Sequence, residues 1–149
     1  MILRTHLAIT VFIIFIFFSH VEYPLIFALV CLIASLLPDI DTYFSKVGNL
    51  ALARPIQFFT KHRGMIHSLT LAILVSLVIS FLFPSISLAF FLGYSIHVFI
   101  DSFTIEGVQP FWPYKFESKG VIKSGSYVEL SLFVTFCLLD AFLLFVLFL

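Results

Sequence analysis

Five long apolar segments constrain the fold of this sequence more than any other feature. Charged residues make up only 11% of the chain, against about 25% in soluble domains, so a surface that faces water on all sides cannot be assembled. A helix of roughly 20 apolar residues can span a bilayer. We therefore predict an all-α integral membrane bundle of about five transmembrane helices. They are expected at Ile2–Phe18, Tyr23–Leu37, Met65–Phe83, Ser85 to about Phe103, and Tyr127–Leu149.

The chain length fits one domain. No internal repeat or low-complexity linker divides it, so residues 1–149 are treated as a single membrane-embedded domain. The first apolar segment has the position of a signal peptide. The residues after it, Ser19 to Glu22, contain no small-x-small cleavage site, so we expect a retained helix.

The basic residues all fall on one side of the predicted bundle. Tight turns at Ser19–Glu22 and Pro84–Ser85 make neighbouring helices antiparallel. Basic loop residues mark the cytoplasmic side of a membrane protein. We therefore predict a multi-pass cell-membrane protein whose N-terminus faces the cytoplasm. A formal net charge of zero gives no basic surface for nucleic acid. The basic residues are Arg4, Lys46, Arg54, Lys61, Arg63, Lys115, Lys119 and Lys123.

Ionisable residues that can bind metal gather at the same cytoplasmic side. His97 and Asp101 are four residues apart, so on a helix they share one face. Asp39 and Asp41 are two apart, and in the extended exit that Pro38 favours they point the same way. Tracing the chain up and down brings these residues to one end of the bundle: His6, Asp39, Asp41, His62, His67, His97, Asp101 and Glu129.

Imidazole and carboxylate ligands together suit zinc, with manganese or iron as alternatives. We predict His6, Asp39, His67, His97 and Asp101 as ligands of a divalent metal centre with two or more ions. Each residue alone also fits a structural role, such as a helix cap or a local hydrogen-bonded pair. Ionisable groups inside membrane helices are costly, and their clustering therefore favours a function.

The residues match the motifs of a known family over nearly the whole chain. The chain resembles the YdjM-type membrane-bound metal-dependent hydrolases, and the resemblance implies hydrolysis. The ligand order is also distantly similar to that of zinc-dependent phospholipases C, without their additional downstream ligands. The matching pieces are Thr5-His6, Leu37-Pro-Asp-Ile-Asp41, His62-Arg-Gly-Met-Ile-His-Ser68, the run from Gly93 to Thr104, and Gly107-Val108 through Phe111-Trp112-Pro113.

We expect a membrane-bound phosphoesterase that acts on a lipid or lipid-linked phosphate reached from the bilayer. Asp41 and His62 are predicted as ligands or as general acid and base. Arg63 is predicted to act beside them and to bind substrate phosphate, because its planar guanidinium suits that geometry. Arg4 and Trp112 are predicted as further substrate contacts.

The surrounding residues also receive expected roles. Thr104 and Ser68 are expected to orient the ligands by hydrogen bonds. Gly107–Pro113 is expected to form a lip over the site. Asp140, far along the last helix, is expected to pair with a Ser or Tyr of a neighbouring helix. The alternative function is a non-catalytic, metal-stabilised scaffold or a metal transporter. A transporter would place its ionisable residues near the bilayer midplane.

Overall fold

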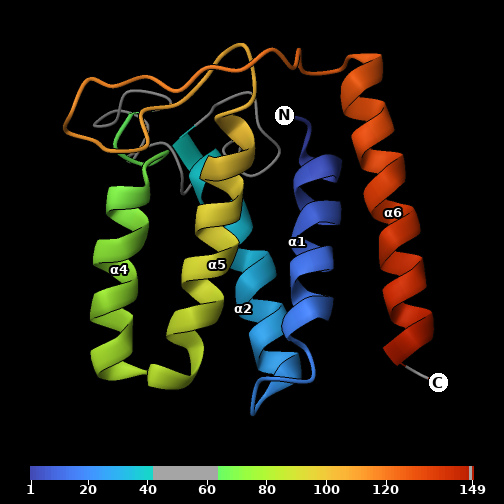
Figure 1. Ribbon diagram of the computed structural model, residues 1–149. Coiled ribbons are helices and arrows are strands. Elements are labelled where there is room, and N and C mark those ends of the chain that lie inside the picture. The colour runs from blue at the N-terminus through green and yellow to red at the C-terminus, as the bar shows by residue number, and fades with distance from the viewer. Residues whose placement is uncertain (42–63, 148) are drawn as a thin grey trace.

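The structure is a computed structural model that describes residues 1–41, 64–147 and 149. The described residues form five α-helices and one 3₁₀ helix, and their only β pairing is two isolated bridges. The prediction of an all-α fold is confirmed. The elements are α1 (Leu3–Phe17), α2 (Pro24–Leu36), η1 (Pro38–Asp41), α4 (Leu69–Leu82), α5 (Pro84–Asp101) and α6 (Tyr127–Leu147), as labelled in Figure 1.

Local sequence explains where the helices begin. Pro24 and Pro84 open α2 and α5, since proline lacks only an N–H that is unsatisfied at a helix start. Ser68 caps α4, because its hydroxyl oxygen accepts a hydrogen bond from Leu71 N–H at 3.2 Å. The expected start at Met65 is therefore four residues early.

Helices that follow one another run antiparallel, as Figure 1 shows. Helix α5 packs against both α4 and α2, and α1 packs against both α2 and α6. The resulting row, α4–α5–α2–α1–α6, differs from the order along the chain. The start of α1, the end of α2, the start of α4, the end of α5 and the start of α6 all lie at the end of the bundle marked by the N-terminus (Figure 1).

A glycine permits a close contact between α2 and α5 in the bundle interior. Gly93 on α5 faces the backbone of Cys31 on α2, and a Cβ added at Gly93 would lie 3.0 Å from Cys31 Cα. Any larger side chain would push the two helices apart. This contact sets the spacing between α2, which η1 with Asp39 follows, and α5, which ends at Asp101.

Two of the helices are long and apolar enough to cross a membrane. These are α5, with 18 residues, and α6, with 21 residues and a mean hydropathy of 2.5. Helices α1, α2 and α4 have 15, 13 and 14 residues. At 1.5 Å per residue they reach roughly 20–23 Å, short of the approximately 30 Å hydrocarbon core. The described structure therefore supports two spans, fewer than the five predicted.

Candidate metal centre

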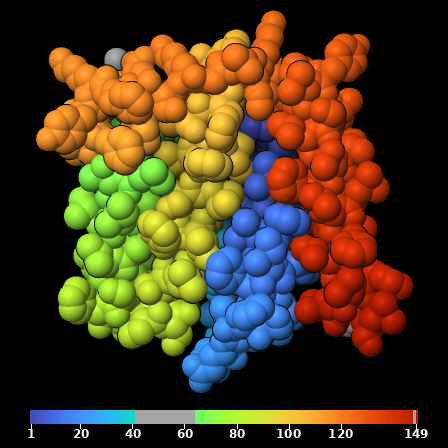
Figure 2. Space-filling view, viewed as in Figure 1, coloured from blue at the N-terminus to red at the C-terminus, as the bar shows by residue number. Residues whose placement is uncertain are grey.

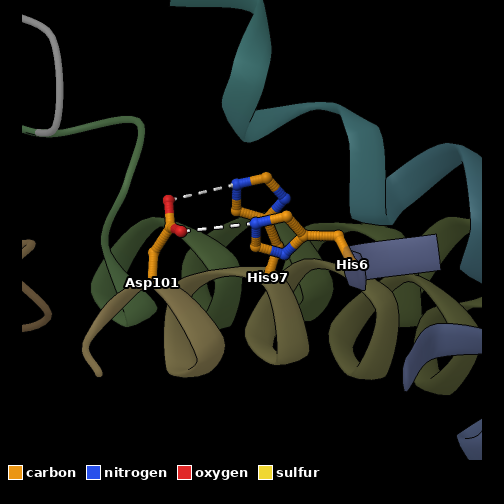
Figure 3. A group of neighbouring side chains, drawn as sticks. All are labelled: His6, His97 and Asp101. Carbon is orange, nitrogen blue, oxygen red and sulfur yellow. Dashed lines mark ion pairs between the residues drawn. The ribbon is translucent and has the colours of Figure 1, made fainter. Parts of the chain in front are cut away.

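The five predicted metal ligands meet at one end of the bundle. His6 lies in the first turns of α1, Asp39 in η1, and His97 and Asp101 in the last turns of α5. The helix predicted from Met65 would have placed His67 in its first turn. In the structure His67 directly precedes Ser68, the cap of α4, and so lies outside the helix. Figure 3 shows His6, His97 and Asp101 together, with a nitrogen of each ring directed at the Asp101 carboxylate.

The distances within this cluster fit the coordination sphere of a small divalent ion. Asp101 Oδ1 lies 3.3 Å from His6 Nε2, and Asp101 Oδ2 lies 3.6 Å from His97 Nε2 and 3.8 Å from His67 Nε2. Asp39 Oδ1 lies 3.7 Å from His97 Nε2. Two ligands at about 2.1 Å from a tetrahedral zinc ion are separated by about 3.4 Å. The ligand atoms thus need little movement to share an ion.

His97 is held in the form that binds metal. Its Nδ1 lies 2.7 Å from the carbonyl oxygen of Ser35. A carbonyl can only accept a hydrogen bond, so Nδ1 carries the proton and, in the neutral ring, Nε2 keeps its lone pair. His97 Nε2 is buried and has no hydrogen-bond partner in the described part of the chain. Metal-binding histidines commonly donate their second ring nitrogen to a carbonyl in this way.

The side chains form two overlapping groups that could hold metal. His6, His97 and Asp101 make one group, and Asp39, His67 and His97 make the other. One imidazole nitrogen has one lone pair, so His97 can bind a single ion. Asp101 directs Oδ1 at His6 and Oδ2 at His67 and His97. Either group would supply three ligands to a divalent ion, and His97 would belong to only one of them at a time.

A match to a protein-family model decides the family. Residues 1–148 match the model described as YdjM inner membrane protein. The chain belongs to the YdjM inner membrane protein family. This confirms the resemblance found from the sequence motifs. No curated protein matches the chain, and no solved structure does.

The centre of this YdjM-family protein is closely packed. The side chains of His6 and His67 are 1% exposed, that of His97 is 0% and that of Asp101 is 3%, whereas that of Asp39 is 21%. The rings of His6 and His97 stack in parallel with centroids 4.1 Å apart. Asp39 is therefore the most exposed of the five candidate ligands.

The terminal ammonium of Met1 also lies beside the cluster. Its nitrogen is 2.7 Å from Asp101 Oδ1. A buried carboxylate is stable only when paired or hydrogen-bonded, and this ammonium provides one such partner. A metal ion bound at the centre would be a second positively charged partner of the same Asp101 carboxylate.

Glu129 joins the starts of α1 and α6 next to the centre. Its side chain is buried and accepts hydrogen bonds from Ile2 N–H at 2.5 Å, the Thr5 hydroxyl at 3.0 Å and Gly125 N–H at 2.5 Å. The sequence placed Glu129 at this end of the bundle and gave it no role. Its place in the first turn of an apolar helix was the only signal, since carboxylates favour helix N-termini.

The Ser68 and Thr104 hydroxyls donate to backbone carbonyls near the candidate ligands, whereas the sequence predicted hydrogen bonds that orient the ligands. The Thr104 hydroxyl donates to the carbonyl of Asp101 at 2.7 Å, and the Ser68 hydroxyl donates to the carbonyl of Met65 at 2.6 Å. Each hydroxyl has one proton, so these bonds use its donor capacity. Both residues thus shape the turns that carry Asp101 and His67.

The Gly107–Pro113 segment packs on the helix ends. Leu69 N–H at the start of α4 donates to the carbonyl of Pro110 at 2.8 Å, and Val108 is buried. Trp112 is 39% exposed at this surface. The segment thus ties α4 to the turn that follows α5.

Other predicted residues lie apart from the ligands or outside the described structure. Arg4 is exposed, and its guanidinium carbon lies 5.2 Å from the centre of the Phe133 ring on α6. Asp41 ends η1 as a 3₁₀ residue, so the expected extended exit is wrong. His62 and Arg63, together with the side chain of Asp41, lie outside the described residues.

Asp140 does not form the interhelical bond predicted for it. Its Oδ1 is buried and has no hydrogen-bond partner among the described residues. The expected pairing with a Ser or Tyr is therefore wrong.

Proposed function

We propose that this YdjM-family protein is a membrane-bound, metal-dependent hydrolase, and specifically a phosphoesterase that acts on a lipid or lipid-linked phosphate. The observation that carries the proposal is the Asp101 carboxylate. Its two oxygens are directed at three histidines that come from three different segments of the chain. Paired divalent ions are the usual means of cleaving a phosphoester with water.

The residues of the chain would have separate roles in metal binding and hydrolysis. His6, His67, His97, Asp39 and Asp101 would hold zinc, or manganese or iron, in one or two positions. Bound ions would supply an activated water and stabilise the charge that develops on the phosphoryl oxygens. In hydrolysis the water oxygen bonds to phosphorus, the bond from phosphorus to the alcohol oxygen breaks, and that oxygen takes up a proton.

Arg63 is proposed to bind the phosphate. Its position between His62 and His67 in the sequence supports this role, because a guanidinium can form two parallel hydrogen bonds to phosphoryl oxygens. Asp41 and His62 remain proposed as additional ligands or as general acid and base. We further propose that the centre faces the cytoplasm, on the basis of the basic residues at this end.

Metal analysis and a phosphoester panel test the proposal together. Protein purified in detergent would be stripped with a chelator, reloaded separately with zinc, manganese or iron, and assayed on phosphate monoesters and diesters. We expect bound metal and metal-dependent hydrolysis. Arg63→Ala should keep the metal and lose turnover, and Arg63→Lys should recover it only partly, because an ammonium lacks the bidentate geometry. Lys119→Ala is the matched control, since Lys119 is exposed and pairs with Glu117.

One observation favours a second function, a non-catalytic scaffold in which metal staples the helix ends. The near-complete burial of His6, His67 and His97 resembles a structural site, which is closed, more than a catalytic site, which keeps an open position. Metal retention without hydrolysis of any ester in the panel, together with unaltered behaviour of Arg63→Ala, would support this scaffold. The ligands lie at helix ends, so no observation on the described residues supports a transporter.

A further inference from the structure

An apolar hollow adjoins the metal centre on the side facing α6. It has a volume of about 400 Å³ and lies between α1, α5 and α6, which is within the usual range of roughly 300–1,000 Å³ for ligand pockets. Figure 2 shows the upper part of α1 (blue) recessed between α5 (yellow) and α6 (red). Its walls include Ile9 and Ile13 of α1, Ile96 and Ile100 of α5, and Leu132 and Phe136 of α6.

The hollow leads toward the metal centre. Met1 lines its wall, and the Met1 nitrogen lies 2.7 Å from Asp101 Oδ1. Ile100, another wall residue, directly precedes Asp101. Along α5 the hollow extends from Ile100 to Ile96, about 6 Å at 1.5 Å per residue. Its axis therefore runs from the cluster into the apolar part of the bundle.

The surroundings indicate what can occupy the hollow. Every residue that lines it is apolar, so it offers no hydrogen bond to a polar ligand. Helix α6 exposes apolar side chains along its length and is long enough to cross the hydrocarbon. The hollow beside it therefore lies where hydrocarbon chains are abundant.

Positive charges near the end of the hollow that adjoins the metal centre favour a phosphate-bearing molecule. Lys123 is exposed and follows Ile122, a wall residue. Arg4 is exposed in the first turn of α1. A molecule with an apolar tail and an anionic head would thus meet matching surroundings at both ends.

We propose that this hollow binds one hydrocarbon chain of a phosphate-bearing membrane lipid and presents its headgroup to the metal centre. The proposal rests on the proposed phosphoesterase function and names its substrate class. It adds the part of the chain that would hold the hydrocarbon of that lipid. A chain seated between α1 and α6 holds the phosphate beside Asp101, because Met1 borders both the hollow and that carboxylate.

Filling the hollow tests the proposal. The probe is lysophosphatidic acid with one oleoyl chain, and glycerol 3-phosphate is its chain-free counterpart. Ile13→Trp and Leu132→Trp enlarge opposite walls, and the second variant keeps the test open if the first does not fold. Leu77→Trp is the matched control, since Leu77 lines a separate hollow between α4 and α5. Bound metal and a single elution peak confirm folding.

Lipid binding is read by native mass spectrometry, and phosphate release by a colorimetric assay. We expect one lysolipid per wild-type chain and a preference for it over glycerol 3-phosphate. Either filling variant should weaken lysolipid binding and lower its kcat/KM at least about tenfold, within the range for altered apolar pocket contacts. The filling variants should hydrolyse glycerol 3-phosphate at the wild-type rate, if wild type hydrolyses it. Leu77→Trp should bind and hydrolyse the lysolipid as wild type does.

The two proposals fail in different ways. If folded Ile13→Trp or Leu132→Trp binds the lysolipid as tightly as wild type, the hollow is not the chain site. An equal loss of both esters in the filling variants would also overturn it, because the effect would then lie in the metal centre. If the lysolipid binds and depends on the hollow but metal-loaded protein releases no phosphate, the binding site stands and the phosphoesterase function fails.

Discussion

Replacing Asp101 by asparagine probes the centre at its most connected residue. The side chain keeps its shape, but it loses its negative charge and one of the two oxygens that face histidines. Asp101 Oδ1 lies 3.3 Å from His6 Nε2, and Oδ2 lies 3.6 Å from His97 Nε2 and 3.8 Å from His67 Nε2. The amide N–H₂ of asparagine would instead point at imidazole nitrogens, where it cannot bind an ion.

The magnitude follows from the position of Asp101 between the candidate ligands. Removing a partner that only orients a metal ligand typically costs 10–100-fold in metal affinity. Asp101 would itself be a ligand of a bound ion, and it lies beside histidines of both candidate ligand groups. We therefore expect Asp101→Asn to weaken metal binding at least about 100-fold, or about 2.8 kcal/mol at 1.4 kcal/mol per tenfold change.

Competition with a chromophoric zinc chelator measures the affinity, and elemental analysis of the purified protein measures the metal content. Asp140→Asn is the matched control, since it makes the same change far from the metal centre. Asp140 lies about 16 Å along α6 from Glu129, which is next to the centre. The control should bind metal as wild type does. Wild-type affinity in a folded Asp101→Asn protein would refute the assignment of Asp101 as a ligand.

Further predictions concern the frame around the centre and its orientation. Gly93→Ala should lower the free energy of unfolding by about 1–3 kcal/mol, because the added methyl overpacks α5 against α2; thermal unfolding in detergent measures it, and an unchanged midpoint would contradict the close contact. Glu129→Gln should cost about 1.5–3 kcal/mol by the same assay, since it weakens charge-assisted hydrogen bonds, and a neutral effect would refute that role. Chelator treatment should destabilise the protein by about 2.7 kcal/mol relative to metal at 100 times its Kd; no shift would argue against a bound metal. In a Cys137→Ser background, Lys115→Cys should resist an impermeant thiol reagent added outside intact cells, and rapid labelling would reverse the proposed orientation.

Much of the candidate site was predictable from the sequence, because helix direction alternates. A chain that crosses back and forth returns to the same end after each pair of apolar segments, so the positions of His6, Asp39, His67 and His97 along their segments already place them at one end. The i, i+4 spacing of His97 and Asp101 adds a shared helix face. Side-chain type then indicates metal chemistry. None of these steps requires knowledge of how the helices pack.

The lateral order of the helices depends on tertiary packing. Gly93 lets α5 approach α2, and this contact brings the Ser35 carbonyl to His97 Nδ1. A backbone carbonyl has no sequence signature, so the partner that sets the His97 tautomer was not predictable. The role of Glu129 was missed for a related reason, because two of its three donors are backbone N–H groups.

The sequence by itself determined an apolar, all-helical chain with most of its histidines and aspartates at one end, because hydrophobicity and helical period are local properties of the residues. Only the tertiary structure decided which ligand atoms face one another, how few helices are long enough to span a bilayer, and where a hollow opens between α1, α5 and α6. These features depend on contacts between residues as far apart as Met1 and Asp101, and such contacts form only when packing selects one arrangement of the helices from many that share the same local pattern.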